Sequence, residues 1–222
     1  MQFQLYPDSM PFSFPKIYPI LDSNAIPEIN RERFLEWLGT GLAEAGVELL
    51  EYRNKSGDES QLLADAGNLR AALPAGKVKL ILDDRADLVE KTHFDGVHVD
   101  AGDVTPVDAR WLLGENHIVG TFGGSDSLLP GILGEPVNYL SIGPVFASQT
   151  KQSTRAPIGI DGVRKLREEA GPNPVLVGVG GITLETARDV LSAGATTVAV
   201  SAAIFGTEDP VAEFQRWMAA LK

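Results

Sequence analysis

Short apolar runs recur along the chain, and each is followed by a polar stretch. The runs cover residues 17–21, 47–52, 78–82, 96–99, 118–122, 139–145, 175–179 and 197–200. Runs of four to eight residues rich in Val, Ile and Leu are typical of strands buried on both faces, as in a parallel sheet. The pattern therefore predicts eight parallel strands.

Three of the stretches between these runs carry apolar residues at helical spacing. The apolar positions are Phe34, Leu35, Leu38 and Leu42 in residues 32–45, Leu184, Ala187, Val190 and Leu191 after Thr183, and Val211, Phe214, Trp217 and Met218 in residues 210–221. Gly46 and Gly194 follow the first two stretches, as expected where a helix stops. Residues 125–134 contain Pro130 and two glycines, which predicts a short or irregular helix after the fifth strand.

Eightfold strand–helix alternation is the pattern of a closed α/β barrel, the (β/α)8 or TIM-barrel fold, in a single domain. The 222 residues suit one such barrel. The alternative is an open doubly wound sheet, which usually shows G-x-G-x-x-G after its first strand. Here Leu21-Asp22-Ser23-Asn24 contains no glycine. We expect residues 1–15 to form an N-terminal arm and residues 16–222 to form the TIM-barrel domain.

Charge and composition narrow the classes of partner. The formal net charge of −11 indicates an acidic surface that repels nucleic acid and anionic membranes. The absence of cysteine excludes disulfides, thiolate catalysis and Cys-ligated zinc. Residues 1–14 do not resemble a signal peptide, and no apolar run approaches the roughly 20 residues of a membrane helix. The expected compartment is the cytoplasm.

Charged residues follow the second strand, at the end of a barrel strand where functional residues of this fold lie. Glu51, Arg53 and Lys55 alternate, so they can point into one cavity. An Arg and a Lys together suit a diphosphate, because a guanidinium binds two oxygens and an ammonium acts as a point charge. The alternative is a solvated cluster of loop charges.

Acidic residues follow the next two strands. Asp83 and Asp84 follow the third strand, and Asp100 and Asp103 follow the fourth. Carboxylates without neighbouring His or Cys suit Mg²⁺, which often shares its coordination with substrate phosphates. The alternative is helix capping by Asp84 and Asp103. Their occurrence on adjacent strands favours the metal site.

Three later strand ends add hydroxyl, lysine and glycine residues. The loop after the sixth strand contains Ser148, Thr150 and Lys151, and its length predicts a mobile lid over a substrate. The seventh and eighth strands are followed by Gly180 and Gly181 and by Ser201 and Ala202. This is the frequent phosphate site of such barrels, where backbone N–H groups approach an anion. The alternative is tight packing at the top of the barrel.

Taken together, these motifs resemble the thiamine phosphate synthase family over residues 17–221. The matching residues, in order, are Arg53, Lys55, Asp84-Arg85, Gly96-Val97-His98-Val99, Asp103, Gly143-Pro144-Val145-Phe146, Thr150-Lys151 and Gly180-Gly181-Ile182. The resemblance implies a transferase that joins hydroxymethylpyrimidine diphosphate to thiazole phosphate, giving thiamine phosphate and pyrophosphate. It also implies small-molecule substrates, no nucleic acid or membrane partner, and Mg²⁺ as cofactor, while a homo-oligomer stays open.

The resemblance also implies residue roles. Arg53, Lys55 and Lys151 would hold the leaving pyrophosphate, and Asp84 and Asp103 would hold Mg²⁺. The remaining substrate contacts would come from the backbone N–H groups of Gly180, Gly181, Ser201 and Ala202, which would receive the thiazole phosphate, and from Ser148 and Thr150, which would line the lid.

The sequence departs from the family pattern at several substrate-binding positions. Glu51 stands where a pyrimidine-binding Gln is usual, Asp83 replaces Asn, and Phe122 replaces Ser. Ser148-Gln149 replaces Thr-Pro in the lid. We expect the Glu51 carboxylate to accept from the pyrimidine's exocyclic amine, and Asp83 to lie beside the diphosphate or to serve as an extra metal ligand.

Two other functions are compatible with the same barrel. A thiazole tautomerase would need a proton-transferring His near the fifth strand, and residues 121–124 contain none. A non-catalytic, phosphate-ligand-binding regulatory barrel is supported by Asp83 and Phe122. His93, His98 and His117 receive no role, and His98 is expected to be a packed strand residue.

Overall fold

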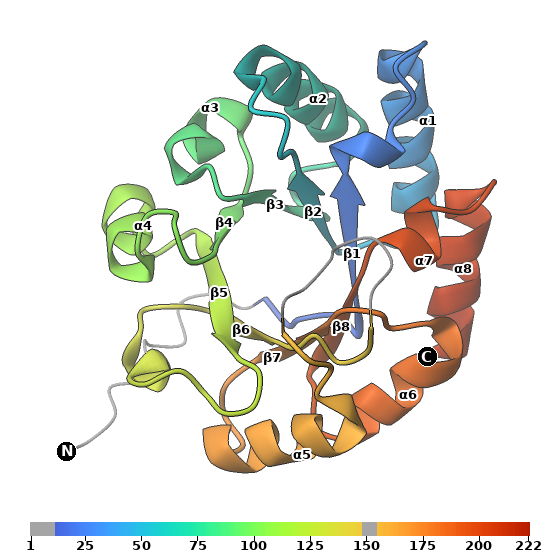
Figure 1. Cartoon of the computed structure of the whole chain (residues 1–222). Coiled ribbons are helices and arrows are strands. Elements are labelled where there is room, and N and C mark those ends of the chain that lie inside the picture. Colours follow the sequence, from blue (N-terminus) through green and yellow to red (C-terminus); the bar gives the residue numbers. More distant parts are fainter. Residues whose placement is uncertain (1–11, 148–154) are drawn as a thin grey trace.

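Eight parallel strands close into a barrel in sequence order in the computed structural model, which describes residues 12–147 and 155–222 (Figure 1). The strands are β1 (Ile17–Asp22), β2 (Leu49–Arg53), β3 (Lys79–Asp83), β4 (Gly96–Val99), β5 (Ile118–Gly124), β6 (Tyr139–Ile142), β7 (Leu176–Val179) and β8 (Thr197–Val200). Each strand pairs with the next, and β8 pairs with β1. The predicted TIM barrel is confirmed.

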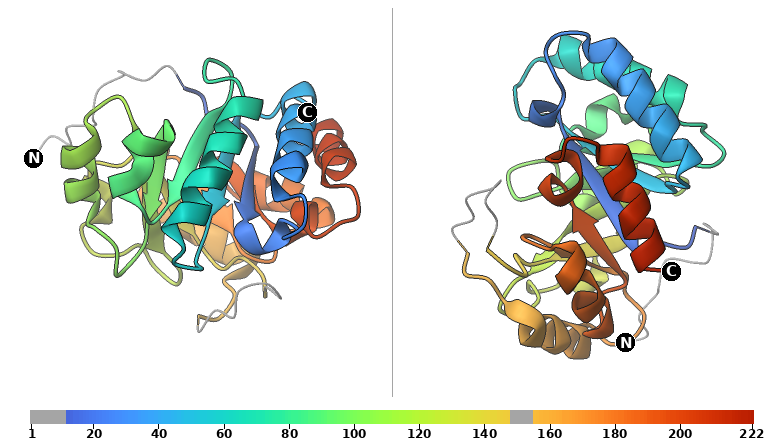
Figure 2. Two further views of the ribbon diagram at one scale, coloured as in Figure 1. Left: turned by 90° about the horizontal axis from the view of Figure 1, so that it is seen from above. Right: turned by 90° about the vertical axis from the view of Figure 1, so that its right-hand side faces the viewer.

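Helices surround the barrel and cover its outer face (Figure 1). They are α1 (Arg31–Glu44), α2 (Glu59–Ala72), α3 (Val89–Thr92), α4 (Pro106–Leu113), α5 (Gly159–Ala170), α6 (Leu184–Ser192), α7 (Ala202–Phe205) and α8 (Pro210–Ala220). Helix α8 packs beside α1, so the ring of helices closes next to the β8–β1 pairing (Figure 2). Short 3-10 turns η1 (Ser23–Ala25), η2 (Ala86–Leu88) and η3 (Ile132–Gly134) complete the connections.

Most predicted boundaries agree with the structure to within a few residues. The connection from β5 to β6 contains only η3, which confirms the irregular helix predicted there. Strand β6 ends at Ile142, whereas the apolar run predicted an end at residue 145. Pro144 has no backbone N–H with which to continue the strand ladder, and Val145 instead donates its N–H to the carbonyl oxygen of Val179 at 2.8 Å.

Apolar residues form two layers, one on each side of the strands. The outer layer lies between strands and helices, and its largest fully buried members are Trp217, Phe214, Leu35, Leu38, Leu42 and Leu69. The inner layer, inside the barrel, consists of Tyr18, Leu49, Ile81, Ile118, Tyr139, Val177 and Ala199. Phe12 and Phe14, from the segment before β1, pack against this inner layer and close the amino-terminal end of the barrel.

A buried polar network ties the first helices to the barrel. The guanidinium of Arg31 on α1 donates to both carboxylate oxygens of Asp65 on α2, and the Tyr52 hydroxyl on β2 donates to Asp65 at 2.5 Å. Asp65 is nearly fully buried, so these charge-assisted bonds compensate its desolvation. The network fixes α1 and α2 against the strand that carries Glu51 and Arg53.

Candidate active site

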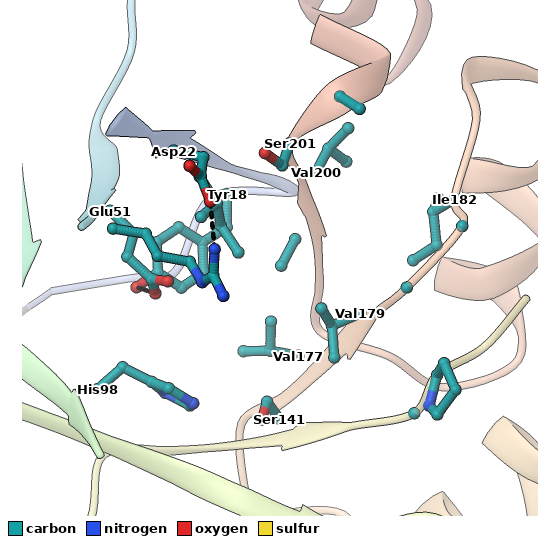
Figure 3. Close-up of a pocket in the computed structure, with 18 of the residues that line it drawn as sticks. Tyr18, Asp22, Glu51, His98, Ser141, Val177, Val179, Ile182, Val200 and Ser201 are labelled. Atoms are coloured by element: carbon teal, nitrogen blue, oxygen red, sulfur yellow. Dashed lines mark hydrogen bonds and ion pairs between the residues drawn. The ribbon is translucent and has the colours of Figure 1, made fainter. Parts of the chain in front are cut away.

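A cavity of about 540 Å³ lies at the carboxyl ends of the strands, inside the ring of helices. Polar side chains of Tyr18, Glu51 and His98 lie on one side of it, and apolar Val177 and Val179 lie on the other (Figure 3). The strand order brings these residues together, since the carboxyl ends of parallel barrel strands all meet at one face. The cavity therefore combines a polar floor with an apolar wall.

Arg53 and Lys55 lie within a row of carboxylates that runs across three strand ends. Arg53 forms an ion pair with Asp22 at the end of β1, the dashed line at Asp22 in Figure 3. The Nε atom of Arg53 lies 3.5 Å from Oδ2 of Asp83. Lys55 Nζ lies 2.7 Å from Oδ2 of Asp83 and also forms an ion pair with Asp84. The two cations are thus held side by side at the rim of the cavity.

The ion pairs change the pKa values of both the carboxylates and the lysine in this row. Burial raises the pKa of Asp83, although the neighbouring Lys55 opposes this shift. Burial alone would lower the pKa of Lys55, but Asp83 and Asp84 raise it above its ordinary value. Lys55 is therefore a stable cation, as a group that holds a diphosphate must be.

Asp84 and Asp103 form a pair of hard oxygen donors beside this row. Asp84 adopts a left-handed backbone conformation with φ of 65°, and its Oδ1 atom is buried without a hydrogen-bond partner in the described part of the chain. Burial and the adjacent Asp84 carboxylate raise the pKa of Asp103. An unpartnered carboxylate oxygen beside a second carboxylate suits Mg²⁺, which takes one or two protein carboxylates and completes its shell with water and phosphate. Within residues 12–147 and 155–222, no cluster of three or more His, Asp or Glu side chains suits a metal.

Glu51 lies on the floor of the cavity in a chain of buried hydroxyls. Tyr18 donates to Oε2 of Glu51 at 2.7 Å, and the hydroxyl oxygens of Tyr18 and Tyr139 are 3.0 Å apart. Nδ1 of His98 lies 3.0 Å from the Tyr139 hydroxyl, with the two rings stacked. Burial raises the pKa of Glu51 to about 7, and the nearby His98 opposes the shift. The floor thus carries a carboxyl group that titrates near neutrality.

Backbone from the β6 and β7 ends forms the opposite side of the site. Phe146 donates its N–H to the carbonyl oxygen of Gly180 at 2.9 Å, which joins the two loops. Gly180 and Gly181 have φ of +97° and +62°, and a Cβ atom on Gly181 would lie 2.4 Å from the carbonyl oxygen of Ala147. Only glycine fits both the conformation and this close approach.

The β8 end contributes Ser201 and Ala202, which line the same cavity. Ser201 is the N-cap residue of the short helix α7 and its side chain makes no capping hydrogen bond. The first N–H groups of that turn have no partner within the helix. Gly180, Gly181, Ser201 and Ala202 therefore meet at one side of the cavity, as their sequence positions predicted.

Phe122 lies on the cavity wall beneath a cation. The guanidinium carbon of Arg155 is 4.2 Å from the centre of the Phe122 ring, within the range of a cation–π interaction. Both side chains line the cavity. Where the family pattern expects a hydroxyl donor, this chain has an aromatic face with a guanidinium above it.

The predicted site residues fall into three groups. Those that line the cavity are Glu51, Arg53, Asp83, Phe122, Gly180, Gly181, Ser201 and Ala202. Lys55 and Asp84 join it through the ion pairs with Asp83, and Asp103 lies beside Asp84. Ser148, Thr150 and Lys151, with the predicted lid, lie outside the described residues.

Sequence reasoning missed several polar residues that line the cavity, among them Tyr18, Asp22, His98 and Tyr139. His98 is buried, as predicted, but it also faces the cavity. The available signal was the twofold period of the strands. Tyr18 and Asp22 share a face of β1, and His98 on β4 lies two residues before Asp100, which follows that strand.

Comparison with known proteins gives consistent similarities. A family model described as thiamine monophosphate synthase matches residues 17–204. The thiamine-phosphate synthase of Koribacter versatilis is 38% identical over 85% of this chain and 88% of its own length, and that of Chloroflexus aurantiacus is 35% identical over 75% and 76%. The solved thiamine phosphate pyrophosphorylase of Pyrococcus furiosus superposes with a TM-score of 0.74 at 26% identity and covers 93% of this chain and 95% of that one. Among the described residues, no helix has the length and apolar character needed to cross a membrane.

Proposed function

The chain belongs to the thiamine monophosphate synthase family, which makes it an enzyme and a transferase, and we propose that its reaction takes place in the cavity inside the barrel. In this reaction a hydroxymethylpyrimidine diphosphate and a thiazole phosphate give thiamine phosphate and pyrophosphate. We further propose that residues 16–222 form the catalytic domain and that residues 1–15 form an N-terminal arm, of which Phe12 and Phe14 pack against the inner layer of the barrel.

The chemical step exchanges one bond for another at the pyrimidine's methylene carbon. The C–O bond breaks and its electron pair leaves with pyrophosphate, and the lone pair of the thiazole nitrogen then forms the C–N bond. The amino group of the pyrimidine donates electrons to the intervening cation, so departure can precede attack. The protein must therefore stabilise negative charge as it grows on the leaving group.

Arg53 and Lys55 supply that stabilisation in our proposal. They are fixed side by side by Asp22, Asp83 and Asp84, so little reorganisation accompanies the reaction. Lys151 would add a third cation from outside the described residues. Removal of one such group commonly costs about 3 kcal/mol in barrier, or roughly a hundredfold in rate.

Mg²⁺ would be held by Asp84 and Asp103, and when bound it would neutralise charge on the diphosphate oxygens. The unpartnered Oδ1 atom of Asp84 and the adjacent Asp103 carboxylate support this assignment. The ion would add positive charge where an acidic protein, with a net charge of −11, otherwise repels a diphosphate.

The two organic rings would lie on opposite sides of the cavity. The pyrimidine would bind near Glu51, Asp83 and Phe122, next to the row of cations. The thiazole phosphate would be held by the backbone N–H groups of the Gly180, Gly181, Ser201 and Ala202 side, with Ser148 and Thr150 from the loop before residue 155. The thiazole nitrogen would then have to face the carbon that loses pyrophosphate.

The observation that carries the proposal is the Asp22–Arg53–Asp83–Lys55–Asp84 row, because it places two cations at the mouth of a cavity large enough for both rings. Pyrophosphate release with both substrates and Mg²⁺ tests it. We expect Lys55→Met to lower kcat/KM by about a hundredfold. Lys77→Met, at an exposed residue before β3, is the matched control.

Two outcomes would contradict the proposal. Wild-type protein that binds thiazole phosphate tightly without releasing pyrophosphate would support a regulatory barrel instead. Normal turnover in Lys55→Met would remove Lys55 from the leaving-group site and would leave the row of charges without its proposed role.

A further inference from the structure

When Glu51 is ionised, the donor and the acceptor of each hydrogen bond along the row of hydroxyls on the cavity floor are fixed. A carboxylate can only accept, so the single proton of the Tyr18 hydroxyl is used in the bond to Oε2 of Glu51. The contact between Tyr18 and Tyr139 then requires Tyr139 to donate. Tyr139 has no second proton, so Nδ1 of His98 must carry the proton in its contact with the Tyr139 hydroxyl.

The direction continues to the far side of the imidazole ring. Nε2 of His98 lies 3.6 Å from Oδ1 of Asp100. Burial alone would lower the pKa of His98, but Asp100 and Glu51 raise it. In the imidazolium form both ring nitrogens carry a proton, so one faces Tyr139 and the other faces the Asp100 carboxylate. The stacking of His98 on Tyr139, with ring centres 5.5 Å apart and an angle of 18° between planes, restricts rotation of both rings. Four strands, β1, β2, β4 and β6, therefore contribute to one chain of contacts.

The hydrogen-bonded side chains on the floor leave the two carboxylate oxygens of Glu51 with different numbers of partners. Oε2 accepts from Tyr18, whereas Oε1 has no hydrogen-bond partner among the described residues, although Glu51 lines the cavity. Titratable and charged groups that face Glu51 come from several strands. They are Tyr18 from β1, Arg53 from β2, Asp83 from β3, His98 and Asp100 from β4, and Tyr139 from β6.

We propose that Tyr18, Tyr139 and His98 are positioning residues that hold the Glu51 carboxylate with one oxygen occupied and the other free for an amino group on the substrate ring. This inference rests on the proposed function, because it takes the ring bound at the floor to be an aminopyrimidine. It adds three residues, to which the sequence assigned no role, and a basis for ring specificity.

Selectivity follows from the loss of rotational freedom. A free Glu side chain could swing away and leave room for a water molecule that donates to a ring with a carbonyl in place of the amino group. Held by the chain, Oε1 opposes that carbonyl with a second acceptor, and two acceptors cannot share a hydrogen bond. Sites built around a buried hydrogen-bonding group reject analogues that lack the partner far more strongly than apolar pockets do.

The test compares binding of two rings that lack the diphosphate, hydroxymethylpyrimidine and its oxo analogue, in which a carbonyl replaces the amino group. Burial raises the pKa of Glu51 to about 7, so the calorimetry is done at pH 8, where the carboxyl group is mostly ionised. We expect the wild type to favour the amino ring by about a hundredfold. Tyr18→Phe should reduce this preference about tenfold, and Tyr139→Phe should reduce it less, because Tyr18 can still donate to Glu51.

His98 offers a matched pair of variants. The side-chain amide of His98→Asn can keep a donor near the Nδ1 position, whereas His98→Leu removes it. We expect the asparagine variant to retain the preference for the amino ring and the leucine variant to reduce it, by no more than Tyr139→Phe does, because Tyr139 can still donate to Tyr18. A residue that only fills space would not separate these two variants in this way.

A preference for the amino ring that survives in Tyr18→Phe, Tyr139→Phe and His98→Leu would overturn the inference, as would wild-type protein that binds neither ring. So would equal weakening of both rings in every variant, since that indicates a general loss of packing. Pyrophosphate release by the wild type is measured separately, so failure of the proposed function and failure of the positioning chain are distinguishable.

Discussion

The ring of Tyr139 occupies the space beside Gly120 in which a side chain would have to lie. A Cβ atom on Gly120 would be 2.0 Å from Cζ of Tyr139, far inside van der Waals contact. The glycine on β5 thus allows the tyrosine on β6 to lie across the interior of the barrel. This contact sets the position of the hydroxyl that links Tyr18 to His98.

Gly120→Ala is therefore expected to displace the Tyr139 ring. Overpacking of this kind typically costs about 1–3 kcal/mol, which should appear as a lower Tm in thermal unfolding. Gly76→Ala is the control, because a Cβ atom there meets nothing within 4 Å. An unchanged Tm in Gly120→Ala would show that Tyr139 can move without cost.

Asp22→Asn is expected to lower kcat/KM about tenfold, or about 1.4 kcal/mol, because it removes the charge that holds Arg53. The amide oxygen can still accept from the N–H of Asn24, so the turn after β1 should persist. Asp209→Asn changes a similar capping residue at α8, outside the cavity, and should leave turnover unchanged. Equal turnover in Asp22→Asn and Asp209→Asn would contradict a positioning role for Asp22.

Stability should depend on pH through Glu51. Burial raises the pKa of Glu51 from 4.5 to about 7 in the folded protein, so the folded state binds more protons than the unfolded state between these values. The contribution of Glu51 to stability is then fully present below about pH 4.5 and is lost as pH rises through about 7. The free energy of unfolding should fall in this window by up to about 3 kcal/mol.

Glu51→Gln cannot titrate and should show a flatter dependence over the same window, measured by denaturant unfolding at each pH. Glu48→Gln, at an exposed residue just before β2, should leave the wild-type curve unchanged in shape. Parallel curves for wild type and Glu51→Gln would mean that Glu51 is not a buried titrating group.

Asp84→Asn should raise the Mg²⁺ concentration needed for half-maximal activity by at least about tenfold, because one of two proposed carboxylate ligands loses its charge. The same titration with Asp103→Asn should give a shift in the same direction. Asp87→Asn, at an exposed carboxylate paired with Arg85, serves as the control. If activity in wild-type protein persists after a chelator removes divalent ions, the metal assignment is wrong.

The barrel could be predicted because its strands are buried on both faces and therefore read as short apolar runs. The periodicity did not give the end of β6, where Val145 continues the apolar run past Pro144 although the backbone pairing changes at that point. An apolar run marks buried residues. Where the loop after a strand also packs inward, the run continues past the last residue that is hydrogen-bonded to a neighbouring strand.

The cavity could be predicted only in part, for a physical reason. Arg53 and Asp83 end their strands and are charged, so they stand out in the sequence. Tyr18 and Tyr139 do not, because an aromatic ring inside an apolar run is most often core and its hydroxyl is a small part of its surface. Both are core residues here as well, and only the three-dimensional contacts show that their hydroxyls meet at Glu51.

Phe12 and Phe14 limit the routes by which substrates and products can reach and leave the cavity. Because they pack under the inner layer and the layer itself is buried, the amino-terminal end of the barrel is closed. The two proposed substrates and the two proposed products would then share the opening at the carboxyl ends of the strands. Since the two rings are proposed to lie on opposite sides of the cavity, this shared route by itself sets no order of binding, and a product that is slow to leave should obstruct the entry of both substrates.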